Sequence, residues 1–180
     1  MKTSYSRTIL LLVAYLAILL IEGYTRVSII ISHFEFEQLG ILKAASQLNM
    51  LIMAIFAVFI LVVIYGVQLI CIELFALKTR PAEILNALRT VLIFLIFINL
   101  VKLGLDLFFM DFNYIDWTNI DQAMLQIQES SWFQLISYLD YIAIAASTLI
   151  FAFELGFNKL KDNLSLTSVF ALCYVLIFIS

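Results

Sequence analysis

Two long apolar runs, joined by a short charged turn, dominate the middle of the chain. They cover Met50–Leu77 and Val91–Phe109, and the turn between them is Lys78–Glu83. A membrane-spanning helix needs about 20 largely apolar residues, because the hydrocarbon layer is about 30 Å thick and each residue rises about 1.5 Å. We therefore interpret this stretch as a transmembrane helical hairpin whose turn lies in the cytoplasm.

One apolar run before this hairpin and two after it complete the pattern. The predicted spans cover about 8–31, 48–77, 90–110, 132–157 and 164–180. Between the third and fourth spans, Ile120, Met124 and Ile127 repeat at helical spacing, which predicts a short helix over about 119–129 on the outer surface. The predicted fold is one all-α integral membrane domain, residues 1–180, with five transmembrane helices and a short extracytoplasmic amphipathic helix.

The segments between the spans give further expectations. Ser32–Gln47 is the first polar break, and we expect an interfacial loop where His33 is followed by Glu35 and Glu37, in preference to a metal site. Arg80–Pro81 is expected to end the second helix, because the residue before proline is disfavoured in the α conformation. Ala82–Thr90 predicts an amphipathic lead-in along the membrane surface that continues into the third span.

Composition agrees with a membrane protein. The chain of 180 residues is 64% hydrophobic and only 13% charged, whereas globular domains are roughly half apolar and about a quarter charged. Lys2, Arg7 and the apolar Ile9–Ile21 resemble a signal peptide, but no small-x-small cleavage site follows, so we keep an uncleaved first helix. No basic patch large enough for nucleic acid is present.

Lysine and arginine concentrate on the cytoplasmic side of membrane proteins. In a five-span arrangement three basic residues fall on one side, namely Arg26, Lys43 and Lys102, and seven fall on the other, namely Lys2, Arg7, Lys78, Arg80, Arg89, Lys159 and Lys161. This asymmetry predicts a cytoplasmic N-terminus and an extracytoplasmic C-terminus.

Ionisable residues inside predicted spans are functional candidates by default. Asp140 is the clearest, and Asn99 falls at a similar depth, so we expect a hydrogen bond between them as part of a polar cluster with Gln68 and Ser137. The favoured role is structural, namely hydrogen bonding between helices that stabilises the bundle. A proton or ion path is the alternative.

Two further pairs have the spacing of one helical turn. Glu22 precedes Arg26 in the order that favours a helical ion pair, although each could instead reach the interface separately. Lys102 and Asp106 are expected to form a second, interfacial pair near the outer end of the third span.

Enzyme signatures are absent from the sequence. It has no glycine-rich phosphate loop, no Gly-x-Ser-x-Gly and no His-Glu-x-x-His, so we expect no catalytic residue and no cofactor. Cys71 and Cys173 lie in apolar runs and are expected to be free. A single histidine cannot form a zinc site without cysteine or carboxylate neighbours at ligand spacing, so we expect no metal site.

Two segments carry a resemblance to a known family. Arg80–Arg89 leading into the third span, and Tyr138–Tyr141 followed by Leu155-Gly156-Phe157 and a basic turn, resemble the Yip family of Ypt/Rab-interacting membrane proteins. The resemblance covers about residues 8–180 and implies five spans with a cytoplasmic N-terminus. Only Met1–Arg7 precedes the first span, which favours a bacterial-type member over the eukaryotic trafficking proteins.

The resulting functional prediction is a non-catalytic polytopic protein of the bacterial cytoplasmic membrane. It would act as an interaction or accessory subunit that contacts lipid and other integral membrane proteins, with an ABC transporter or a second copy of the chain as candidate partners. The alternative is a small transporter or channel that uses Asp140 and Asn99. A membrane-trafficking factor is the weaker alternative.

Overall fold

The computed structural model describes residues 2–33, 39–110, 115, 117, 120–156 and 160–179. All regular structure in these ranges is α-helical. The helices are α1 (Lys2–Ile31), α2 (Leu39–Leu74), α3 (Pro81–Phe108), α4 (Ile120–Glu129), α5 (Ser131–Leu155) and α6 (Leu160–Ile179). Glu35, Glu37, residues 111–114, 116, 118 and 119, and Asn158 and Lys159 lie outside the described residues.

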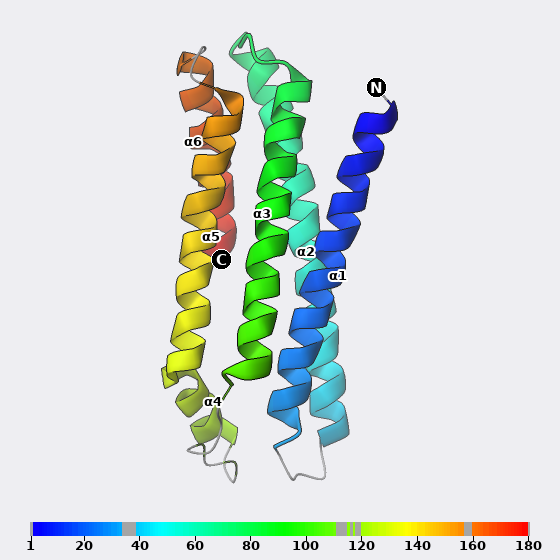
Figure 1. The fold of residues 1–180 in the computed structure, drawn as a ribbon, viewed down its shortest axis with the longest axis vertical. Coiled ribbons are helices and arrows are strands. Elements are labelled where there is room, and N and C mark those ends of the chain that lie inside the picture. The colour runs from blue at the N-terminus through cyan, green and yellow to red at the C-terminus, as the bar shows by residue number, and fades with distance from the viewer. Residues whose placement is uncertain are drawn as a thin grey trace.

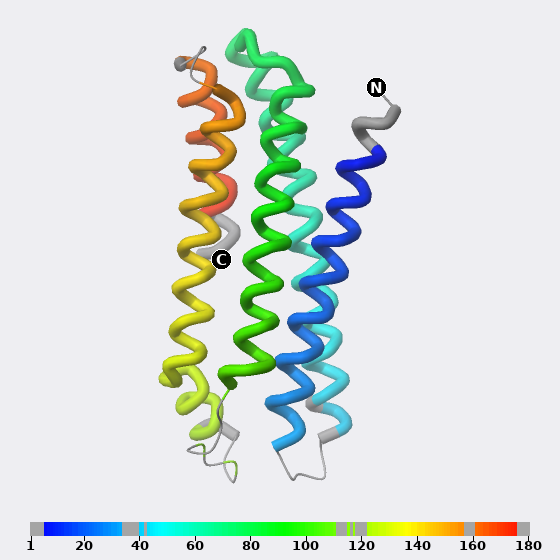
Figure 2. Tube along the Cα trace, viewed as in Figure 1, coloured from blue at the N-terminus to red at the C-terminus, as the bar shows by residue number. Residues whose placement is uncertain are grey.

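The long helices form an elongated bundle with α3 at its centre. α3 packs against α1 on one side and α5 on the other, while α2 lies against α1 and α6 packs on α5 and α2 (Figures 1 and 2). The N-terminus and the turn between α2 and α3 lie at one end, which we call the basic end. α4 lies at the other, which we call the α4 end.

Within the residues that the structure describes, four helices are long and apolar enough to cross a membrane: α1, α2, α3 and α5. Many large apolar side chains on their outer faces are exposed, Phe59 and Phe97 among them, as expected where lipid replaces water. The buried core is apolar as well and includes Ile64, Val91 and Phe151. The molecule is therefore an all-helical protein compatible with integration into a membrane.

The structure corrects the predicted limits of α2. Leu39–Gln47 is helical, although the sequence suggested a loop there, so α2 has 36 residues and is about 54 Å long. α2 also ends at Leu74, before Arg80–Pro81. Its end is a Schellman turn, in which Ala76 has φ 49° and the backbone N–H of Leu77 donates to the carbonyl of Ile72.

The lead-in Ala82–Thr90 is not a separate surface segment. It is the first third of a continuous α3, and its apolar residues Ile84 and Ala87 are fully buried in the bundle core. Pro81 occupies the first turn, and the Glu83 carboxylate accepts from the backbone N–H of Arg80 at 3.0 Å. α3 has 28 residues and is about 42 Å long, longer than the hydrocarbon core of a bilayer, which is about 30 Å thick.

α4 packs against the start of α5 and forms a second, smaller hydrophobic core with it. Ala123 and Ile127 are buried against Trp132 and Ile136 of α5, whereas Met124, expected on the apolar face, is 45% exposed. Ser130 separates the two helices, and its hydroxyl accepts from the backbone N–H of Phe133 as the N-cap of α5.

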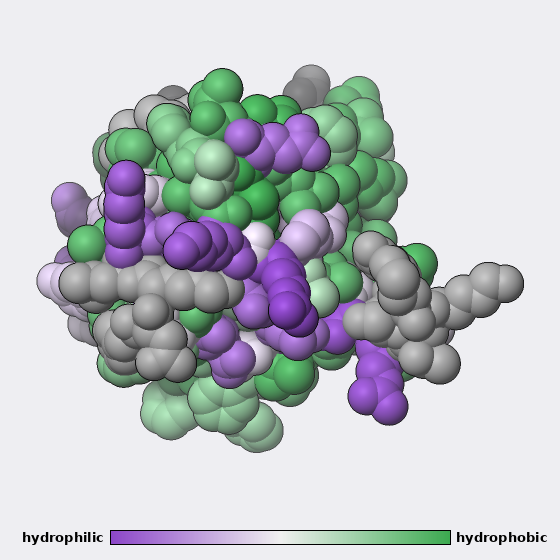
Figure 3. Space-filling view, turned by 90° about the horizontal axis from the view of Figure 1, so that it is seen from above, coloured by the Kyte–Doolittle hydropathy of each residue, from purple (hydrophilic) through white to green (hydrophobic). Residues whose placement is uncertain are grey.

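At the basic end the contacts are polar and join α6 to its neighbours. The Asp162 carboxylate accepts from the backbone N–H of Lys78 at 2.6 Å, and the Asn163 amide donates to the carbonyls of Ala152 and Gly156 at the end of α5. Hydrophilic residues form a band across this end, with hydrophobic ones on both sides (Figure 3).

Candidate functional site

The main concentration of buried charge in the described residues is centred on Arg26. Its guanidinium Nη2 lies 2.6 Å from Glu22 Oε1 and 3.1 Å from Asp106 Oδ2, so one arginine joins two carboxylates on α1 and α3. The Asp106 side chain is completely buried and that of Glu22 is 7% exposed. The pair of Glu22 and Arg26 predicted from the sequence is present. The contact with Asp106, 80 positions away, was not predicted.

Trp132, at the start of α5, adds an aromatic face to this cluster. The guanidinium carbon of Arg26 lies 5.6 Å from the centroid of the Trp132 ring, within the range of a cation–π interaction. Trp132 thus brings α5 to a cluster otherwise formed by α1 and α3, and sequence analysis did not single it out.

A second ion pair joins α3 to α5. The ammonium group of Lys102 contacts the carboxylate of Asp140, and the two side chains are 9% and 35% exposed. The predicted pair of Lys102 and Asp106 is therefore wrong, because each residue binds a partner on another helix. Together with Arg26 these contacts define the ion network, namely Glu22, Arg26, Lys102, Asp106 and Asp140.

The predicted hydrogen bond between Asp140 and Asn99 is also wrong. Instead, the Asn99 amide donates to the carbonyl of Leu95 in its own helix at 2.7 Å, and the Asp140 carboxylate binds the Lys102 ammonium group. Ser137 likewise donates to a carbonyl one turn earlier on its own helix. Gln68 donates to the carbonyl of Leu166 at 2.9 Å and links α2 to α6. These three residues therefore do not form one cluster with Asp140.

The ion network lies toward the α4 end, inside the bundle. Lys102 is six residues from the last residue of α3, or about 9 Å by helical rise, and Asp140 is nine residues from the first residue of α5, or about 14 Å. Three carboxylates share two cations, so the fully ionised network carries one net negative charge. Charge at such depth is costly in a bilayer unless it is paired, and its presence marks a functional or structural site.

Other candidate chemistry stays unsupported in the described residues. No group of three or more His, Cys, Asp or Glu side chains that could hold a metal ion occurs there. His33 Nδ1 lies 2.8 Å from the carbonyl of Ile29, and its ring stacks on Trp117 with 4.9 Å between centroids. Both cysteines are free, with Cys71 buried and Cys173 half-buried.

Glu154 lies toward the basic end, near the end of α5. The structure shows its carboxylate accepting from the Thr90 hydroxyl at 3.1 Å, between α5 and α3.

Comparison of the chain with protein-family models, with curated proteins and with solved structures found no match. The class of protein therefore rests on the fold and on the ion network: an all-helical, membrane-compatible bundle with paired charges in its interior. The resemblance to the Yip family stays a prediction from the sequence.

Proposed function

We propose that the chain is a non-catalytic polytopic membrane protein that works through contacts with other integral membrane proteins, as an accessory subunit of a membrane complex. In this proposal α6 is a fifth span, the basic end faces the cytoplasm and the membrane is a bacterial cytoplasmic membrane. An ABC transporter remains a candidate partner on the strength of the family resemblance.

The observation that carries this proposal is that the chain supplies partners for its own buried charges. Arg26 joins Glu22 and Asp106, and Lys102 joins Asp140, so these side chains cross-link α1, α3 and α5. A network of this kind holds an interior in one arrangement. The surface that remains for recognition is then the outer face of the bundle, which is apolar over most of α2.

Photo-crosslinking in the native membrane tests this proposal. A photoreactive residue at Phe59, which is 58% exposed on α2, should give one discrete adduct with another integral membrane protein. The matched control is the same group at Ile64 of α2, which is 1% exposed and should give no intermolecular adduct. Identical adduct patterns at the two positions, or solute flux catalysed by the isolated protein in liposomes, would count against an accessory role.

A second candidate is a small transporter or channel that uses Asp140. It is favoured by the excess of one carboxylate in the network and by the 35% exposure of the Asp140 side chain. The purified protein should then carry protons or cations across liposome membranes, and Asp140→Ala should abolish the flux. Equal flux in the wild type and the variant would exclude this mechanism. The trafficking alternative rests on the family resemblance alone.

A further inference from the structure

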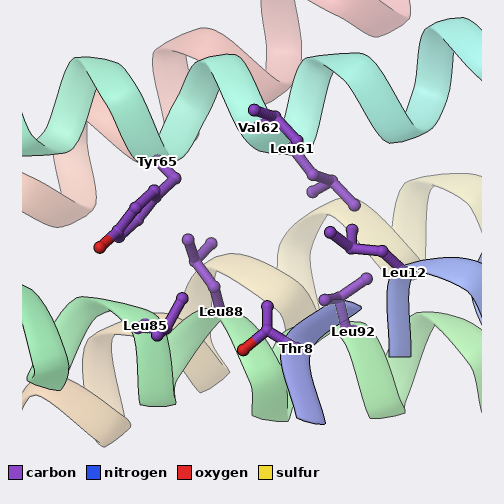
Figure 4. A pocket seen from close by; sticks show the side chains of 8 residues that line it. All are labelled: Thr8, Leu12, Leu61, Val62, Tyr65, Leu85, Leu88 and Leu92. Atoms are coloured by element: carbon purple, nitrogen blue, oxygen red, sulfur yellow. The ribbon is translucent and has the colours of Figure 1, made fainter. Parts of the chain in front are cut away.

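An apolar pocket lies between α1, α2 and α3 toward the basic end, away from the ion network. Eight side chains from these three helices line it (Figure 4), namely Thr8, Leu12, Leu61, Val62, Tyr65, Leu85, Leu88 and Leu92. α1 leans away from α3 toward its N-terminal end, which is where Thr8 lies (Figure 1). The pocket therefore forms where three helices with apolar faces diverge.

Its size and opening restrict what can occupy it. The volume is about 70 Å³, well below the roughly 300 Å³ or more of sites for drug-sized ligands and about half of a cavity that holds benzene. Val62, on its wall, is 51% exposed, so the pocket opens to the outside of the bundle. An α-helix about 10 Å wide cannot enter it. A void of this size that opens into hydrocarbon is filled by part of one hydrocarbon chain.

The pocket is apolar along its length. Leu12, Leu61 and Leu92 line the end nearer the middle of the helices, Tyr65 lies at the end nearer the turn, and Thr8 lies between them (Figure 4). From Leu85 to Leu92 the wall of α3 extends about 10 Å by helical rise. A narrow apolar pocket that runs along the helices suits a segment of a lipid tail.

Basic residues lie beside Thr8 on the pocket wall. The Arg89 guanidinium donates from Nε to the Thr8 hydroxyl at 2.7 Å and from Nη1 to the Asn86 side-chain oxygen at 2.9 Å, and these hydrogen bonds hold it next to the pocket. Arg7, beside Thr8 in the sequence, is exposed. Arginine next to a groove for a lipid tail complements a phosphate group electrostatically.

From this geometry we propose that the pocket binds an anionic phospholipid, with a segment of one acyl chain between α1, α2 and α3 and the phosphate at Arg89. The occupant is a phospholipid because the pocket is apolar, opens to the outside of the bundle and is bordered by Arg89, whose guanidinium complements a phosphate group. This site is independent of the ion network and of the accessory role.

Native mass spectrometry of the full chain tests the proposal, after exchange into nanodiscs of equal parts phosphatidylglycerol and phosphatidylcholine. The wild type should retain one phosphatidylglycerol in preference to phosphatidylcholine. Val62→Phe should displace it by filling the pocket from its open side. Arg89→Gln should lower the ratio of the two retained lipids about five-fold, the factor expected for one arginine close to an anionic headgroup.

Two matched variants make the result specific. Val63→Phe adds the same bulk at a neighbouring α2 position that is 44% exposed and does not line the pocket. Lys161→Gln removes one exposed charge from the same end of the bundle. Both should leave lipid retention unchanged. If Val62→Phe retains lipid like the wild type, or if Lys161→Gln lowers the lipid ratio as much as Arg89→Gln does, the proposed site is wrong.

Discussion

The two ends of α3 hold the bundle together by different interactions. Toward the basic end, Ile84, Val91 and Leu95 are buried among other apolar side chains, and the apolar pocket interrupts that packing. Toward the α4 end, Lys102 and Asp106 bind charged partners on α5 and α1. One helix thus changes from apolar packing to ion pairing within a few turns.

This difference matters because lipid is the solvent around a membrane helix. Apolar contacts between helices gain little over apolar contacts with lipid tails, so apolar packing alone gives weak selectivity for a neighbour. A buried ion pair is strongly selective, because separating it leaves a charge without a partner in hydrocarbon. We infer that the α4 end fixes which helices are neighbours, while the basic end tolerates divergence of α1 and a small pocket.

Removal of Arg26 should therefore have the largest effect. Arg26→Leu leaves the buried carboxylates of Glu22 and Asp106 without their shared cation, and we expect it to lower the free energy of unfolding by about 3–5 kcal/mol. The measurement is unfolding by sodium dodecyl sulfate in mixed micelles, followed by circular dichroism. Arg7→Leu, an exposed arginine on the same helix, is the control and should cost at most about 0.5 kcal/mol. Equal losses for the two variants would contradict the comparison.

The pair of Lys102 and Asp140 should matter less, because the Asp140 side chain is 35% exposed. Asp140→Asn keeps an oxygen that can accept from Lys102, so the fold should persist with a loss of about 1 kcal/mol. Asp140→Leu removes that acceptor and should cost about 2–3 kcal/mol. The same micelle titration ranks the two variants, and a larger loss for asparagine than for leucine would argue against an ion pair here.

A smaller effect is expected from the close approach of α1 and α2. A Cβ atom at Gly23 would lie 2.5 Å from Cγ of Met50, whereas one at Gly66, further along α2, would meet nothing within 4 Å. Gly23→Ala should therefore lower the free energy of unfolding by about 1 kcal/mol. Gly66→Ala should raise it by about 0.5 kcal/mol through helix propensity. If both substitutions shift the free energy of unfolding in the same direction, α1 and α2 do not approach each other as described.

The sequence predicted the helical class and the approximate apolar runs, because length and hydropathy are local properties. It also predicted the pair of Glu22 and Arg26, which depends only on helical spacing. The same spacing rule failed for Lys102 and Asp106, because each found a partner on another helix. Which residues meet across helices depends on how each helix is rotated in the bundle, and spacing within one helix does not encode that rotation.

The contact of Trp132 with Arg26 could not be predicted from the sequence either. In the sequence it is one of several aromatic residues flanking a span, where tryptophan is common. Only the packing of α1 and α5 on the two sides of α3 places its ring 5.6 Å from the Arg26 guanidinium. The sequence analysis also placed the start of α2 too late, at about residue 48 instead of Leu39. It considered only the length needed to cross the membrane, whereas the helix continues beyond that length.

The contact of Arg26 with Asp106 can be measured directly by a double-mutant cycle. The free energy of unfolding is determined for the wild type, Arg26→Leu, Asp106→Leu and the double variant under identical micelle conditions. The account predicts a coupling energy of about 2 kcal/mol or more, because Arg26→Leu is less harmful once Asp106 no longer carries a charge. Losses that add within about 0.5 kcal/mol would show that the two residues do not interact, and the ion network would not be what joins α1 to α3.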